Sequence, residues 1–165
     1  MSIRNKLLAV EGIALSLTGI LLYLSNREKE DWMRKRDSAQ RYYDTVFRWM
    51  MNESEGMRLD QTLHEQGIQK VAIYGYGKLG ELLYKKLQKI GVKISYIADV
   101  NKLLGLDPEI NVPTFTPDRM GEAPEADIII VTPVNDYDAI VKQIRDKGVE
   151  TKCISLDGLV MNSLS

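Results

Sequence analysis

Residues 71–82 read VAIYGYGKLGEL, in which Gly75, Gly77 and Gly80 form a G-x-G-x-x-G pattern directly after four apolar or aromatic residues. In a strand–loop–helix unit, the first glycine permits a tight turn, the second lets the backbone approach a diphosphate, and the third allows close packing of helix on strand. The N-terminus of the following helix offers unpaired N–H groups and a partial positive charge. The stretch therefore predicts a loop that holds the phosphates of a nucleotide. Its candidate binding residues are Gly75, Tyr76, Gly77, Lys78, Leu79 and Gly80.

The region from residue 68 onward alternates strand and helix patterns. The predicted strands are Lys70–Tyr74, Lys93–Ala98, Val112–Phe115, Asp127–Thr132 and Lys152–Ser155. The predicted helices are Lys78–Ile90, Pro117–Met120 and Tyr137–Lys147. Near-continuous apolar strands such as IIIV at 128–131 are typical of a parallel sheet that is covered on both faces. Right-handed crossovers then favour an α/β fold, a Rossmann-like doubly wound sheet of about five strands in the order 3-2-1-4-5.

Polar residues follow two of these strands where such a sheet binds its ligand. Asp99 ends the second strand at about the expected distance from Gly75, and its carboxylate can accept hydrogen bonds from a ribose diol. Thr132, Pro133 and Asn135 follow the fourth strand and are candidate contacts in the same crevice. Purely structural roles remain open, because Asp99 can cap the next segment and Asn135 or its neighbour can cap the next helix. Lys78 is equally consistent with a phosphate contact and with a solvated lysine.

The sequence shows no catalytic residues beside the predicted crevice. No Tyr-x-x-x-Lys pattern follows the fourth strand, since Tyr137 has Val141 at that spacing. Tyr84 lies on the first helix of the alternating region, where we expect it to point away from the loop. The tail after Ile154 is too short to form a substrate site of its own. We therefore expect a protein that binds a nucleotide and shows no catalytic residues of its own.

Composition narrows the class of protein. The chain has 165 residues, room for one compact domain and an appendage, and its formal net charge of −1 argues against a nucleic-acid binder. Its single cysteine, Cys153, rules out an internal disulfide and cysteine-based zinc sites and fits a reducing compartment such as the cytoplasm. The single histidine, His64, leaves little for any other transition metal, and we predict no metal site.

The first zone, residues 1–26, contains the apolar stretch from Leu7 to Leu24. A run of about 18 apolar residues is at the lower limit for spanning a bilayer, and Glu11 near its start opposes insertion. Two interpretations remain open, a membrane anchor and a helix packed on protein. Basic residues are denser after the stretch than before it, which would keep the rest of the chain on the cytoplasmic face.

The second zone, residues 27–67, reads as a helical linker or pairing region that ends in a shorter helix from Leu59 to Gln66. Its long helix carries an apolar stripe at 3-4 spacing, which Arg36 interrupts and which Phe47 and Trp49 widen. The apolar positions of the stripe are Trp32, Ala39, Tyr43, Val46 and Met50. Such a stripe is typical of helix packing or of pairing between subunits.

Residues 68–165 then form the predicted nucleotide-binding domain.

From about residue 41 to 160, the chain resembles small bacterial Rossmann-type proteins of capsular and surface polysaccharide gene clusters. The segments that carry the resemblance are VAIYGYGKLGELLYKKLQKIGVKISYIADVN, INVPTFTPDRM, ADIIIVTPV and CISLDGLV. The pattern is also similar to the nucleotide-binding domains of membrane-bound nucleotide-sugar 4,6-dehydratases, related sugar-phosphate transferases and sialic-acid-type acetyltransferases. The resemblance implies phosphate-loop roles for Gly75, Gly77 and Gly80, and crevice roles for Asp99 and Thr132-Pro133.

Three functions are therefore open. The first is a module that binds NAD(P) or a nucleotide sugar without catalysis, associated with polysaccharide enzymes. The second is half of an oxidoreductase or epimerase whose substrate site is completed by a partner or a second subunit. The third is a scaffold in which the N-terminal helices assemble a homo-oligomer or hold a polysaccharide enzyme.

Overall fold

The computed structural model describes the backbone of residues 3–162 and the side chains of residues 18–161. The chain divides into two compact units, residues 1–40 and 41–165, which are described separately. Residues 3–40 of the first unit lie in α1, a continuous helix from Ile3 to Ser54 whose last turns belong to the second unit. The helix ends at Ser54, and residues 3–26 of the first zone share it with most of the second zone.

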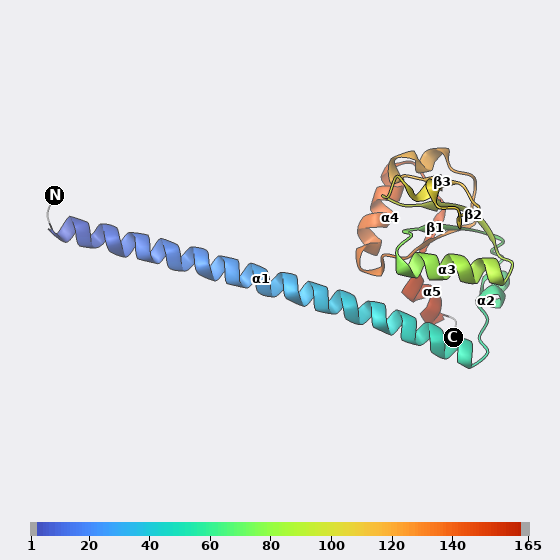
Figure 1. The fold of residues 1–165 in the computed structure, drawn as a ribbon, viewed down its shortest axis with the longest axis horizontal. Helices are drawn as coiled ribbons and strands as arrows, with labels where there is room; N and C mark the ends of the chain where they lie inside the picture. Colours follow the sequence, from blue (N-terminus) through green and yellow to red (C-terminus); the bar gives the residue numbers. More distant parts are fainter. Residues whose placement is uncertain (1–2, 163–165) are drawn as a thin grey trace. The chain divides into compact units, whose positions relative to one another are not determined.

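A parallel sheet of five strands forms the centre of the second unit, in the order β3-β2-β1-β4-β5 (Figure 1). This confirms the predicted α/β fold and strand order. The central strand pairs on both sides, with Ile73 opposite Ile97 and Ile130. The strands are β1 Lys70–Tyr74, β2 Lys93–Ala98, β3 Thr114–Phe115, β4 Ile128–Val131 and β5 Lys152–Ser155.

Helices connect the strands and cover the sheet. The α-helices after α1 are α2 Leu59–Glu65, α3 Lys78–Lys89, α4 Tyr137–Asp146 and α5 Leu156–Asn162. The short 3-10 helices are η1 Leu104–Leu106, η2 Pro117–Glu122 and η3 Val134–Asp136. The helix predicted after Thr116 is therefore a 3-10 helix. The tail after β5 forms a helix whose Leu156, Leu159 and Val160 are buried in the core.

The strands are buried on both faces, as their near-continuous apolar sequence predicts. On β1, Val71 and Ile73 pack into a core with α2, α3 and α5, whereas Ala72 and Tyr74 pack into a second core with η2 and α4. Figure 1 shows α3 and α4 on opposite sides of the sheet. With both faces covered, binding groups lie at the ends of the strands.

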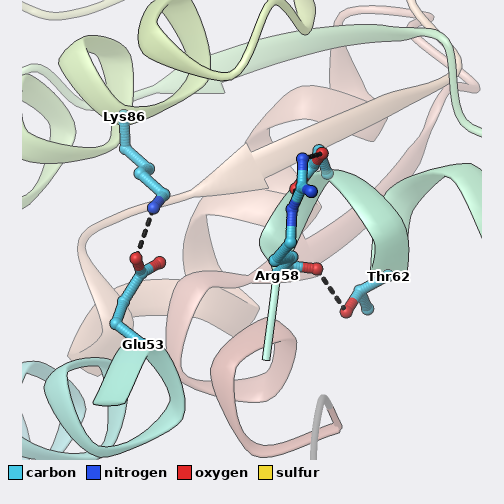
Figure 2. Close-up of polar contacts among 5 residues, drawn as sticks. Glu53, Arg58, Thr62 and Lys86 are labelled. Carbon is cyan, nitrogen blue, oxygen red and sulfur yellow. Dashed lines mark hydrogen bonds and ion pairs between the residues drawn. The ribbon is translucent and has the colours of Figure 1, made fainter. Parts of the chain in front are cut away.

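The last turns of α1 are anchored to the second unit. Trp49 is buried in the core beside α2, and the Asn52 Nδ2 atom donates a hydrogen bond of 2.7 Å to the Val160 carbonyl in α5. Figure 2 shows the ion pair of Glu53 with Lys86 of α3, and the nearby hydroxyl of Thr62 that donates to the Arg58 carbonyl. These contacts make residues 41–54 part of the nucleotide-binding domain predicted to begin near residue 68.

The apolar stripe predicted along this helix is exposed within the single chain at every position except Val46, which is partly buried against the core. Trp32, Tyr43 and Met50 are 65%, 61% and 67% exposed, respectively. The side that packs on the domain carries Thr45 and Trp49 instead. Sequence periodicity identified an apolar face but could not show that a different face makes the contact within the chain.

Among the residues whose side chains are described, no helix is long and apolar enough to cross a membrane. Most of the predicted anchor, residues 7–17 of the stretch from Leu7 to Leu24, lies outside those residues. Membrane anchoring therefore stays a prediction.

Candidate functional site

The predicted binding residues meet at the carboxyl ends of three adjacent strands. The glycine loop, residues 75–80, follows β1, Asp99 follows β2, and the segment 132–135 follows β4. Because β1 lies between β2 and β4, these segments surround the point where the strand order reverses. Open α/β sheets bind their ligands at this point.

Gly75 makes the tight turn that the pattern predicts. Its φ of +90° lies in the left-handed region that favours glycine, and its N–H donates a hydrogen bond of 2.8 Å to the Ala98 carbonyl. A Cβ atom on Gly75 would lie 2.7 Å from Pro133 Cδ and 2.9 Å from Thr132 Oγ1. Backbone conformation and space therefore both require glycine here.

Gly80 provides the close approach of helix to loop. A Cβ atom at this position would lie 2.0 Å from the carbonyl oxygen of Gly75. That oxygen is also held from the other side, because the hydroxyl of Thr132 donates to it at 2.8 Å. The structure thus confirms the packing roles of the first and third glycines.

Gly77 differs from both, because no steric contact within the protein explains the missing side chain. Its φ of −72° is open to any residue, and no heavy atom lies within 4 Å of where its Cβ atom would be. It is the exposed N-cap of α3, and the first hydrogen bond of that helix runs from the Glu81 N–H to the Gly77 carbonyl at 2.9 Å. In the described part of the chain, the N–H groups of Lys78 and Leu79 have no backbone acceptor.

The remaining loop residues have different surroundings. Lys78 is exposed in the first turn of α3, where an ammonium group is free to meet an anion in the crevice. The side chain of Leu79 is a core residue, so only its backbone faces the crevice. Tyr76 is half-buried and packs edge-on against Tyr84, with 5.7 Å between the ring centres.

Asp99 ties the glycine loop to the end of β2. Its Oδ2 atom accepts a hydrogen bond of 2.5 Å from the Tyr76 N–H, and its Oδ1 atom accepts one of 2.7 Å from the Asn101 N–H. The capping role that the sequence left open is therefore present. A ribose diol would share this carboxylate with the loop, because each carboxylate oxygen can accept more than one hydrogen bond.

We expect Asp99→Ala to lower the free energy of unfolding by about 1–3 kcal/mol, because two charge-assisted hydrogen bonds are lost together. The measurement is urea denaturation followed by circular dichroism. Asp107→Ala is the matched control, since that carboxylate caps a turn by accepting only the Glu109 N–H at 2.9 Å. An equal loss in both variants would contradict the loop-holding role of Asp99.

The residues after β4 shape the crevice more than they line it. Thr132 is 5% exposed, and its hydroxyl is bonded to the Gly75 carbonyl, so it holds the loop. Pro133 lies against Gly75. Asn135 is exposed in η3, and Asp136, the N-cap of α4, makes no side-chain capping bond. Among the predicted binding residues of this segment, Asn135 is the exposed one.

Tyr84 was placed wrongly by sequence reasoning, which had it pointing away from the loop. It is 1% exposed and packs on Tyr76, and its hydroxyl accepts hydrogen bonds from the Asn111 N–H at 2.9 Å and from Gln88 Nε2 at 2.8 Å. It thereby fixes the β2–β3 connection against α3. The signal in the sequence is its position four residues after Gly80, which places both on one face of the helix.

Burial raises the pKa of two tyrosines, Tyr76 in the glycine loop and Tyr96 in β2. Desolvation, followed by the neighbouring Tyr84, raises the pKa of Tyr76 to about 12, and desolvation raises that of Tyr96 to about 12. A raised pKa means that folding favours the neutral phenol. The resulting contribution to the free energy of unfolding is complete below pH ~10, the ordinary pKa of tyrosine, and is lost as pH rises toward 12. We expect the urea midpoint to fall across this range. Tyr96→Phe should make that fall shallower, and an unchanged slope would contradict the assignment.

A cavity of about 380 Å³ lies beside this site, at the carboxyl ends of β4 and β5. It shares Asn135 with the crevice and places one cationic side chain among several carboxylates. Within residues 18–161, no three His, Cys, Asp or Glu side chains gather as metal ligands. The charged and hydroxylic residues that line the cavity are Arg41, Asp136, Tyr137, Asp138, Ser155 and Asp157.

No protein-family model matches the sequence, and a comparison with curated proteins finds no significant match.

Proposed function

We propose that the domain binds the phosphates of a nucleotide-type ligand, NAD(P) or a nucleotide sugar, at the glycine loop. The observation that carries the proposal is Gly77. Packing accounts for Gly75 and Gly80, but no protein atom lies within 4 Å of the Cβ position of Gly77. A residue that keeps the backbone bare toward open space suits a ligand that must approach that backbone closely.

The surroundings of Gly77 favour an anion. The loop leads directly into α3, whose first N–H groups point out of the helix and carry the positive end of its dipole. Lys78 adds an exposed ammonium group in the same turn. Phosphate groups are the usual ligands of such a helix start in α/β sheets.

The rest of the ligand would extend along the strand ends. The carboxylate of Asp99 can accept hydrogen bonds from a ribose. The cavity that Asn135 lines contains Arg41 and carboxylates, which can bind the hydroxyl groups of a sugar. This cavity supports a nucleotide sugar, and Asp99 supports NAD and nucleotide sugars equally, because a carboxylate there favours a free ribose over a 2′-phosphate. A link to surface polysaccharide synthesis is proposed on the resemblance stated above. Cys153 and the basic residues after Leu24 support a cytoplasmic location, with anchoring at the membrane as the further proposal.

The hydrogen bonds of two nearby tyrosines favour ligand binding without catalysis. The hydroxyl of Tyr74 donates to Gln143 at 3.2 Å, and that of Tyr137 donates to the Cys153 carbonyl at 3.0 Å. Burial raises the pKa of both phenols, so neither is prepared to act as a base at neutral pH. Half of an oxidoreductase or epimerase, completed by groups from a second chain, stays the alternative proposal.

The test is calorimetric titration of the full chain with NAD⁺, NADP⁺, UDP and UDP-glucose, with free uridine and free nicotinamide as controls without phosphate. We expect at least one phosphate-bearing ligand to bind at micromolar to low millimolar concentration and its phosphate-free control to bind far more weakly. Absence of binding by all four at 5–10 millimolar, or equal binding of the controls, would overturn the proposal.

A further inference from the structure

The last turns of α1 and the outer face of α3 form an apolar groove of about 420 Å³. Its floor is Val46, Trp49 and Met50 from α1 and Leu82 from α3, and Leu82 is 45% exposed. Tyr43 and Phe47 continue the apolar surface along α1, with 61% and 53% of their surface exposed. Clusters of large exposed apolar side chains mark surfaces that bind another molecule.

The charge at the groove is positive. Lys86 and Lys89 line it from α3, and its one carboxylate, Glu53, is already paired with Lys86. An occupant that fits must bring large apolar side chains together with carboxylates.

The chain itself carries a segment of this chemistry. Residues 28–33 of α1 read EKEDWM, with Trp32 and Met33 65% and 46% exposed beside carboxylates. Glu28 lies four residues before Trp32 and so shares its helix face. A second copy of the chain carries this segment on its own α1 and can present it to the groove.

The spacing of the stripe suits pairing of α1 with an antiparallel copy of itself. An antiparallel pair centred on residue 41 places Trp32 of one copy opposite Met50 of the other, and places Ala39 opposite Tyr43. Arg36 falls opposite Val46, and its guanidinium can remain at the edge because it is paired with Asp37 at 3.0 Å. Apart from Val46, which meets Arg36, every position of the stripe meets another position of the stripe, which is the self-complementarity that a two-fold dimer requires.

We propose that the chain forms a two-fold homodimer in which α1 pairs antiparallel with α1 of the second copy, and Trp32 of each copy enters the groove between α1 and α3 of the other. The carboxylate of Glu28 then lies toward Lys89. This pairing covers the apolar stripe that a single chain leaves in water. It does not depend on what the glycine loop binds.

The first test measures the mass of the full chain by light scattering after size-exclusion chromatography. The expected mass is twice 18.8 kDa for the unmodified protein and one chain for Trp32→Glu and for Met50→Glu. Met51→Glu is the matched control, since Met51 is 40% exposed on the same helix but off the stripe, and it should leave the dimer intact. A monomeric unmodified chain, or a dimer that survives both stripe variants, would overturn the proposal.

The second test reverses charges and does not depend on how a single variant folds. Lys89→Glu and Glu28→Lys should each weaken the dimer several-fold, as measured by the dilution at which it dissociates. Their combination in one chain should restore dimerisation, because the opposite charges face each other again. If the double variant dimerises as weakly as the two single effects added together predict, Glu28 and Lys89 do not face each other between two copies, and the proposed arrangement is overturned.

Discussion

Gly80→Ala is expected to lower the free energy of unfolding by about 2–4 kcal/mol. The added methyl group would lie 2.0 Å from the Gly75 carbonyl oxygen, a backbone atom that Thr132 already holds in place. Relief requires α3 to move away from the loop, which would open the core around the buried Leu83 and Leu87. Urea denaturation followed by circular dichroism measures the loss.

Gly77→Ala is the matched control, because it makes the same substitution three residues earlier. Its methyl group would meet no atom within 4 Å, and its φ of −72° is allowed for alanine. Its free energy of unfolding should fall by no more than about 1 kcal/mol, the cost of replacing a glycine N-cap by alanine. Equal losses in the two variants would show that the third glycine is not required by packing.

Gly77→Val is expected to weaken nucleotide binding by tenfold or more while the domain stays folded. The branched side chain would project into the open space before α3, where we propose that phosphates contact the backbone. The measurement is calorimetric titration with whichever of the phosphate-bearing ligands binds the unmodified protein. Thermal denaturation of the same samples checks that the fold is retained.

Gly121→Ala is the control for this prediction. Gly121 lies in η2, and its added Cβ atom would make only an ordinary contact, 3.6 Å from the Lys147 carbonyl. Binding should be unchanged in this variant. If Gly77→Val binds as tightly as Gly121→Ala, the ligand does not approach the loop backbone at Gly77.

The sheet was predictable from sequence because its signals are local. The apolar strands are short runs bounded by glycine and polar residues, and β1, β2 and β5 begin and end at the predicted residues. The roles of Gly75 and Gly80 were predictable for the same reason, since the G-x-G-x-x-G spacing describes one turn and one helix start. The weakest strand pattern gave the largest error, and β3 is only Thr114–Phe115.

What sequence could not give depends on contacts between distant segments. Two hydrogen bonds join the ends of separate strands. The Tyr76 N–H donates to Asp99, and the Thr132 hydroxyl donates to the Gly75 carbonyl. Periodicity alone also could not tell which side of α1 the domain covers, because Trp49 packs inward while Met50 stays exposed. In each of these cases, the residue type alone was compatible with ligand binding, and only the fold shows which group of the protein the residue contacts.

Binding of phosphate at the backbone before α3 is the central claim, and amide NMR tests it most directly. Nucleotide is added to the isotope-labelled full chain, and the N–H resonances of the loop and of the two ends of α3 are followed. The account predicts that the largest shifts occur at Gly77, Lys78 and Leu79, that they saturate, and that Lys89 and Ile90 at the other end of α3 stay unchanged. Saturating shifts centred on other residues, or no shift at Gly77 at 10 millimolar nucleotide, would contradict it.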